Sequence, residues 1–194
     1  MAVTQLAASA DVVAALGRSL TTAETARVGS ILDNASEQFR RRSGQTFTTS
    51  TPTVRLKVNG GRVYLTQRPV TSVTSVVDSA GAAVTYTHAG QWLTIDSAST
   101  SCSSDAFVTV TYAAGGAVPD VVRLRIADIA RRILMIPATT AGGSTKHSET
   151  RGPFSVSDEY AAWAVGGQTM LSPDDSALAD SYRVRVPSVV VMRP

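Results

Sequence analysis

The chain has 194 residues, of which 43% are hydrophobic and 17% are charged, and its formal net charge is +3. This length suits one domain with a buried core, and no apolar run approaches the roughly 18 residues of a transmembrane helix. The single Cys102 excludes an intramolecular disulfide, and a small charge spread along the chain does not indicate a dedicated nucleic-acid-binding protein.

Two helices are predicted near the N-terminus. Residues Asp11–Leu16 form a short one, which the glycine that follows should end. Thr21 and Glu24 then have the spacing of a capping box, in which each side chain accepts a hydrogen bond from a free backbone N–H of the first turn. Apolar residues recur at helical spacing beyond it, so the sequence predicts a long helix over about residues 22–42. Its end coincides with Arg40–Arg42, since cations are favourable at a helix C-terminus.

The middle of the chain, residues 53–113, changes to the two-residue period of strands. Glycine- and serine-rich turns separate the apolar runs, and Asn59–Gly61 indicates a hairpin between the first two. Six strands are predicted: Val54–Val58, Val63–Leu65, Val73–Val77, Val84–Tyr86, Trp92–Ile95 and Phe107–Tyr112. Their alternation predicts a compact antiparallel β-subdomain with one solvated face.

Helical spacing returns at Pro119, a favoured first helical position, and predicts a second long helix over residues 119–136. Its core stripe runs from Val122 to Ile136. Further apolar residues lie outside this stripe, among arginines, which indicates that the helix packs between its own core and a neighbouring subunit. The candidate interface residues are Leu124, Arg125, Arg131, Arg132 and Leu134.

The region after this helix is rich in Gly, Ser and Thr, so residues 138–150 are predicted to form a loop. Arg151–Val156 is predicted to be a short extended piece. Ser172–Asp175 is typical of a helix start, with a capping serine, a proline and an acidic first turn, and leads into Ala177–Tyr182. We attribute the two aspartates of that turn to the helix dipole.

The final segment, residues 183–194, alternates basic and apolar residues and predicts an extended tail. Pro187 and Pro194 bound a valine run that has no adjacent strand to pair with, so a partner protein is expected to supply the edge. The candidate binding residues are Arg183, Val184, Arg185, Val186, Val189, Val190 and Val191. Deleting the tail should abolish attachment to its partner and leave the thermal stability nearly unchanged.

The sequence carries no recognisable signature of catalysis, metal binding or cofactor binding. His88, in a predicted hairpin turn, and His147, in the predicted loop, have no further ligands at metal-binding spacing. No Gly-x-Ser-x-Gly elbow occurs, and none of the Gly-Gly pairs has the pattern of a phosphate-binding loop. Trp92 and Trp163 are isolated in sequence, so no aromatic platform is predicted. We expect a protein that is not an enzyme, without catalytic residues, metal or cofactor.

Five segments, taken in order, carry a further pattern. They are DVVAALGRSLTTAETARVGSILDNASEQFRRRSGQTF, VYLTQRPVTSVTSVVDSAG, VTVTYAAGGAVPDVVRLRIADIARRIL, GPFSVS and LSPDDSALADSYR. Together they resemble the head-to-tail connector (adaptor) proteins of siphophages that infect actinobacteria. The first is similar to the opening helices of that family, the second to its strands around an "RPV" turn, and the third to its strand-to-"VP"-helix junction.

The resemblance implies an α+β fold with a small helical core and an inserted antiparallel β-subdomain, to which the C-terminal residues add an extended tail. Residues 1–194 would form a single adaptor domain. Its parts would be N-terminal helices in 1–44, a β insertion in 53–113, a C-terminal helical part in 119–182 and the tail in 183–194.

The resemblance also implies a structural virion protein. Such a protein forms a ring, commonly of twelve copies, which docks under the portal protein at the head-tail interface, or neck, of the virion. It is made in the host cytoplasm and receives a stopper or tail-completion protein on its far face. Double-stranded DNA passes through the lumen without sequence-specific binding, and no membrane is involved. The alternatives are another neck protein, such as a stopper or tail terminator, and a β-rich carbohydrate- or host-binding module.

Overall fold

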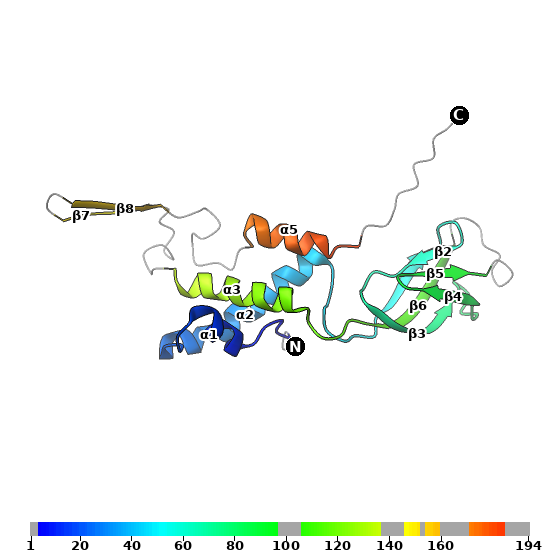
Figure 1. Ribbon diagram of the computed structural model, residues 1–194. Coiled ribbons are helices and arrows are strands. Elements are labelled where there is room, and N and C mark those ends of the chain that lie inside the picture. The colour runs from blue at the N-terminus through cyan, green and yellow to red at the C-terminus, as the bar shows by residue number, and fades with distance from the viewer. Residues whose placement is uncertain (1–3, 97–105, 137–145, 152–153, 160–170, 185–194) are drawn as a thin grey trace, which may run out of the picture. The chain divides into compact units, whose positions relative to one another are not determined.

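The computed structural model is α+β, as the sequence predicts, with helices and small antiparallel sheets (Figure 1). It describes residues 4–96, 106–136, 146–151, 154–159 and 171–184. The chain divides into two compact units. We call Met1–Ser43 with Val118–Ser181 the helical unit, and Gly44–Ala117 with Tyr182–Pro194 the β unit.

The helical unit begins with helices α1 (Ser9–Leu16) and α2 (Thr22–Ser43), at the places where the sequence predicts them. Gly17 ends α1 in the left-handed conformation, with a φ of 68°. The predicted capping box starts α2: the backbone N–H of Glu24 donates to the Thr21 hydroxyl at 3.3 Å, and the N–H of Thr21 donates to the Glu24 carboxylate at 2.8 Å. These local motifs therefore fix the end of α1 and the start of α2.

Helices α3 (Asp120–Leu134) and α5 (Pro173–Ser181) complete the described helices of this unit. Helix α3 packs on α1 and α2, and α5 packs on α2. The predicted stripe of α3 is buried from Val122 to Ile133. Pro119 has the extended ψ of 137° and precedes the helix as its N-cap, so its predicted place within the first helical turn is wrong by one residue.

The β unit contains two three-stranded antiparallel sheets, with strand orders β1-β6-β3 and β2-β5-β4. The strands are β1 (Thr53–Lys57), β2 (Arg62–Tyr64), β3 (Val70–Val77), β4 (Tyr86–Ala89), β5 (Trp92–Ile95) and β6 (Phe107–Ala114). The six predicted strands are present, although the fourth begins at Tyr86 and not at Val84.

The predicted hairpin between the first two strands is wrong. β1 pairs with β6 and β2 pairs with β5, so the two strands belong to different sheets. The turn itself does form, because Asn59 and Arg62 exchange backbone hydrogen bonds of 2.8 and 3.0 Å. A turn signal fixes the local chain reversal, but the sheet partner of each strand depends on distant residues.

One apolar cluster joins the two sheets of the β unit. Every second residue of β6 from Val108 to Ala114 is buried and packs with side chains such as Leu93 from β5. Tyr112, fully buried, accepts a hydrogen bond from the backbone N–H of Gln67 at 3.1 Å. The strict alternation along β6 explains why the sequence pattern located this strand well.

The first segment of the β unit, Gly44–Ala117, begins and ends at neighbouring positions. Ser50 and Ala114 exchange two backbone hydrogen bonds of 2.9 Å, which hold the incoming and outgoing segments side by side. Gly115 follows, with a φ of 87°, and a Cβ there would lie 2.1 Å from the carbonyl oxygen of Thr48. Only glycine fits this close approach of two backbone segments.

A third sheet consists of β7 (Lys146–Arg151) and β8 (Phe154–Glu159), which form an antiparallel hairpin (Figure 1). The predicted loop over 138–150 is therefore wrong for residues 146–150, and His147 lies in a strand. Residues 138–145 of that loop are outside the described part of the chain. The polar sequence of β7 has no apolar alternation and little β propensity, which is why the pattern did not reveal it.

Candidate functional site: the outer face of helix α3 and its ion-pair network

The outer face of α3 carries exposed apolar side chains on one side of the helix. We define this face by Val121, Leu124, Asp128, Arg131 and Met135, whose three- and four-residue spacing places them in one stripe. Val121 and Leu124 are each 57% exposed, and Met135, just past the last turn, is 60% exposed. Because the buried stripe from Val122 to Ile133 lies on the opposite side, α3 has one apolar side in the core and another facing out.

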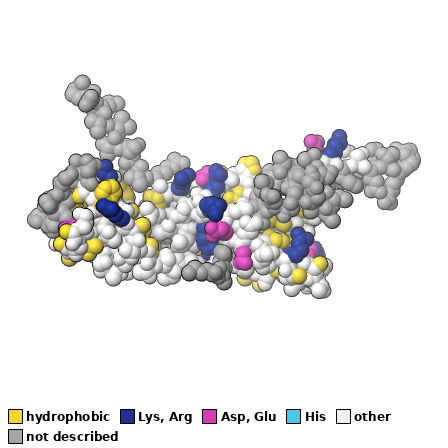
Figure 2. Space-filling view, turned by 180° about the vertical axis from the view of Figure 1, so that it is seen from behind, with side chains coloured by type: hydrophobic (Ala, Val, Ile, Leu, Met, Phe, Trp, Pro, Cys, Tyr) yellow, Lys and Arg dark blue, Asp and Glu magenta, His cyan; other side chains and the backbone are white. Residues whose placement is uncertain are grey.

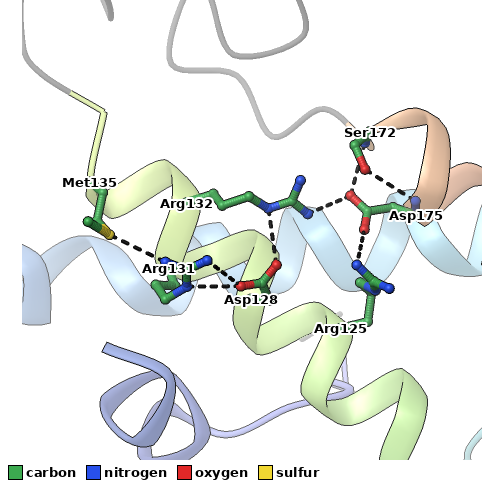
Figure 3. A network of polar contacts seen from close by, with 7 residues as sticks. All are labelled: Arg125, Asp128, Arg131, Arg132, Met135, Ser172 and Asp175. Carbon is green, nitrogen blue, oxygen red and sulfur yellow. Dashed lines mark hydrogen bonds and ion pairs between the residues drawn. The ribbon is translucent and has the colours of Figure 1, made fainter. Parts of the chain in front are cut away.

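An ion pair occupies the middle of this outer face. The guanidinium of Arg131 donates two hydrogen bonds to one carboxylate oxygen of Asp128, at 2.7 and 2.9 Å, and a third to the sulfur of Met135 at 3.6 Å (Figure 3). The other carboxylate oxygen of Asp128 lies 3.3 Å from the Nε of Arg132. The charges of the face thus neutralise one another, which reduces the cost of covering it with an uncharged partner surface.

Behind this pair, Asp175 at the start of α5 is fully buried between two arginines of α3. One of its carboxylate oxygens accepts a hydrogen bond from Arg132 at 2.6 Å and another from the backbone N–H of Ser172 at 2.9 Å. The other oxygen lies 3.5 Å from the guanidinium of Arg125. The N–H of Asp175 donates in turn to the Ser172 hydroxyl at 3.2 Å.

Asp175 therefore does more than complement a helix dipole, the role that the sequence suggested. It completes a capping box with Ser172 and joins α5 to α3 through the two arginines (Figure 3). Burial of a carboxylate is costly unless cations and hydrogen-bond donors surround it. The Ser-x-x-Asp spacing was the signal that could have revealed the box, but its cationic partners lie more than forty residues away in sequence.

Of the five predicted interface residues, Leu124 and Arg131 belong to the outer face of α3 and the other three do not. Leu124 presents apolar surface to the outside, whereas Leu134 is half-buried. Arg131 pairs with Asp128 on its own helix. The other two arginines of the prediction contact Asp175 within the helical unit. Sequence reasoning missed Val121 and Met135, although their helical spacing from Leu124 was a usable signal.

The predicted tail is described only at its start. Arg183 is exposed and Val184 is half-buried. The remaining candidate residues, from Arg185 to Val191, lie outside the described part of the chain.

Ion pairs also join other elements of the helical unit, and basic and acidic side chains lie side by side on its surface (Figure 2). The Arg18 guanidinium, 2.7 Å from Glu24 and hydrogen-bonded to it, lowers the pKa of Glu24 to about 2. Arg123 pairs with Asp120 at 3.0 Å and with Asp11, and these carboxylates raise the pKa of the guanidinium. Ion pairs thus supplement the apolar packing between elements of this unit.

The histidine that the sequence placed in a turn lies in strand β4. His88 is exposed, and its Nε2 is 2.8 Å from the carbonyl oxygen of Gly90.

An open hollow in the helical unit is lined by Gln5–Ala8, Asp11, Val118 and Arg123, and its two charged residues pair with each other. Among the residues that the structure describes, no three His, Cys, Asp or Glu side chains are grouped to hold a metal ion. No helix in the described ranges combines the length and apolar character that crossing a membrane requires.

The β unit contains an aromatic pair that the sequence does not reveal. Trp92 is isolated along the chain, but it lies across from Tyr64 in the pairing of β2 with β5, with ring centroids 6.5 Å apart. Trp92 is 39% exposed, so the pair forms a small aromatic surface. Trp163, the other tryptophan, lies outside the described residues.

No protein-family model matches this chain, and no curated protein matches its sequence.

Proposed function

We propose that this chain is a structural virion protein that forms the adaptor ring between the portal and the stopper or tail of a tailed phage, and that it is not an enzyme. Three of the five segments that resemble siphophage connectors, residues 11–47, 108–134 and 171–183, contain the four described helices except for the first residues of α1. The α+β fold agrees with the fold that this resemblance implies. Such a protein functions through contacts with copies of itself and with its neighbours.

The observation that carries the proposal is the outer face of α3. Val121, Leu124 and Met135 are all more than half exposed on one side of one helix, with a neutralised ion pair between them. Covering each of these side chains contributes on the order of 1 kcal/mol, because part of each is already buried. A second copy that covers this face would therefore stabilise an oligomer, and a ring repeats the same contact at every subunit.

The other partners follow from the adaptor role. The ring would hold about twelve copies, dock on the portal through the tail that begins at Arg183, and receive a stopper or tail-completion protein at its far face. DNA would pass through the lumen with weak, sequence-independent contacts, since tight phosphate binding would stall its transit. A titration that finds tight binding with base preference would contradict this account.

Substitution of Leu124 tests the proposal directly. The purified full chain should form rings in negative-stain images and a matching assembly in mass photometry. Leu124→Asp should shift the population towards monomers at the same concentration, because an isolated carboxylate would be buried in the contact. Circular dichroism should remain unchanged, since the side chain is exposed. Ala26→Asp, on an exposed position of α2, is the matched control and should retain the rings.

Two results would contradict the proposal at different levels. Rings that persist unchanged in Leu124→Asp would exclude the outer face of α3 as the subunit contact. A wild-type chain that remains monomeric at high concentration and does not bind to portal-bearing heads would exclude the adaptor role itself.

A second candidate function, carbohydrate or host binding, is favoured by the Tyr64–Trp92 pair, since sugar rings stack on exposed aromatic faces. The pair is small, and its rings are tilted by 55°. A glycan-binding screen distinguishes the two functions: binding that is lost in Trp92→Ala would support this candidate over the adaptor.

A further inference from the structure

Within the described residues, the β7–β8 hairpin forms a separate sheet of two strands. No other described strand joins this sheet, and among the described elements β7 and β8 pack extensively only on each other. An isolated two-stranded hairpin is only marginally stable in water. Each of its outer edges can also accept a further strand through backbone hydrogen bonds.

The two strands of the hairpin carry opposite charges. β7 contains two cations and one anion, whereas β8 contains two anions, Asp158 and Glu159, and no cation. In the hairpin register Lys146 is opposite Glu159, and the side chains of both are exposed. The basic strand of one copy is thus complementary in charge to the acidic strand of another copy.

Three pairings between two copies can be compared. If β7 paired in antiparallel alignment with β7 of a second copy, Lys146 would lie opposite Arg151, and like charges in that position are destabilising. If β8 paired with β8, two strands that each carry two carboxylates would become neighbours. If β8 paired with β7 of the next copy, the register of the hairpin itself would be repeated, with Lys146 again opposite Glu159. Charge favours the third arrangement.

The third arrangement also has the symmetry of a ring. β7 is antiparallel to β8, and β8 would be antiparallel to β7 of the next copy, so successive hairpins would point in the same direction. Such a contact joins two different surfaces and repeats from copy to copy, which generates a closed ring or a filament. The first two pairings join identical surfaces and would stop at a dimer.

We propose that the β7–β8 hairpins of neighbouring copies add edge to edge, β8 of one copy on β7 of the next, and form one antiparallel sheet around the assembly. The partner is thus a second copy of this chain. The closure of that sheet into a ring rests on the proposed adaptor function, but the pairing of the edges does not.

Disulfide cross-linking of the full-length chain tests the pairing. Cys102 is the sole cysteine, so Cys102→Ser provides a background into which Ser148→Cys and Ser157→Cys are introduced in separate chains. Both serines are exposed, and they face each other in the hairpin register. Residues directly opposite in antiparallel strands have Cα atoms about 4.5–5.5 Å apart, which suits a disulfide.

Mild oxidation of the mixed chains should give a disulfide-linked dimer that joins position 148 of one copy to position 157 of another. Each variant alone should give only background cross-linking. The matched control mixes Ser148→Cys with Ser79→Cys, an exposed serine of the β unit, and should also give background.

A second measurement uses Lys146→Glu and Glu159→Lys. Each variant alone should assemble less than the wild type. An equimolar mixture should recover assembly, because opposite charges again face each other between copies.

The outcomes separate this inference from the adaptor role. If the wild type forms rings but the mixed cysteine variants do not cross-link, the hairpin pairing is wrong and the adaptor proposal is unaffected. Cross-links between two copies of the Ser157→Cys variant would also overturn the pairing, since they require identical edges to meet. Cross-linking of 148 to 157 in an open filament would support the pairing and contradict the ring.

Discussion

Helix α5 of the helical unit and the sheets of the β unit are held to their neighbours by different means. In the helical unit, α5 contacts its neighbours through ion pairs, with Asp175 held by Arg132 at 2.6 Å and Asp180 by Arg42 at 2.6 Å. Its own buried side chains are only Asp175 and Ala179. In the β unit, one cluster of buried valines, leucines and Tyr112 fills the space between two sheets.

This difference predicts different sensitivities. An apolar cluster is stabilised by the removal of surface from water, and salt or moderate changes in pH affect it little. Ion pairs weaken when salt screens them or when a carboxylate becomes protonated. The attachment of α5 should therefore respond to substitutions and conditions that change charge, and the β unit to substitutions that change volume.

The largest expected effect is in the β unit. Leu93→Ala removes a fully buried side chain from the cluster, and loss of the burial together with the cavity left behind should cost about 3 kcal/mol of stability. Hydrogen exchange should show the loss in amides of β5 and β6, while amides of α2 and α3 keep their protection. Equal loss in both units would mean that they unfold as one, and the comparison would fail.

A somewhat smaller effect is expected when Asp175 is replaced by alanine. The change removes a cap and leaves Arg125 and Arg132 without their shared carboxylate. Breaking a buried pair costs roughly 3–5 kcal/mol, and the partial exposure of both arginines should bring the loss to about 2 kcal/mol. Exchange should increase in α5 and α3 and not in β6. Asp174→Ala, at an exposed neighbouring position, is the control; an equal loss there would assign the effect to the helix dipole.

The smallest effect concerns pH. The hydrogen bond from Arg18 lowers the pKa of Glu24 from 4.5 to about 2, so ionised Glu24 stabilises the folded state fully above about pH 4.5. This contribution should be lost as the pH falls from 4.5 through 2, and the first turn of α2 should then fray. An NMR titration of the Glu24 carboxyl and the Thr21 amide would measure it. Glu24→Gln should remove the pH dependence; a Glu24 that titrates near 4.5 would contradict the pairing.

Sequence reasoning succeeded where the determining residues are neighbours along the chain. Thr21 and Glu24 cap α2 within one turn, Gly17 ends α1, and the alternation of β6 is complete within eight residues. From these elements the α+β class followed. These features depend on local geometry, which a pattern of residue types contains.

It failed where the partner is distant. The turn at Asn59 was predicted correctly, but β1 pairs with β6, whose residues lie about fifty positions further along the chain. In the sequence, Asp175 is an ordinary acidic residue of a first helical turn. Only the fold shows that Arg125 and Arg132 contact it. Of the candidate interface, Leu124 was predicted from its helical position, whereas the pairing of the arginines within the unit could be known only from the fold.

The hydrogen bonds between Ser50 and Ala114 affect how the sequence of this protein can vary in evolution. Because Ser50 and Ala114 are hydrogen-bonded to each other, the segment between them is topologically an insert. A longer, shorter or exchanged segment would leave the spacing of the flanking helices unaltered. The entropic cost of closing a longer insert grows only with the logarithm of its length, about 0.6 kcal/mol for each doubling. Natural variation should therefore tolerate large differences in length between Ser50 and Ala114, while Gly115, pressed against Thr48, should remain invariant.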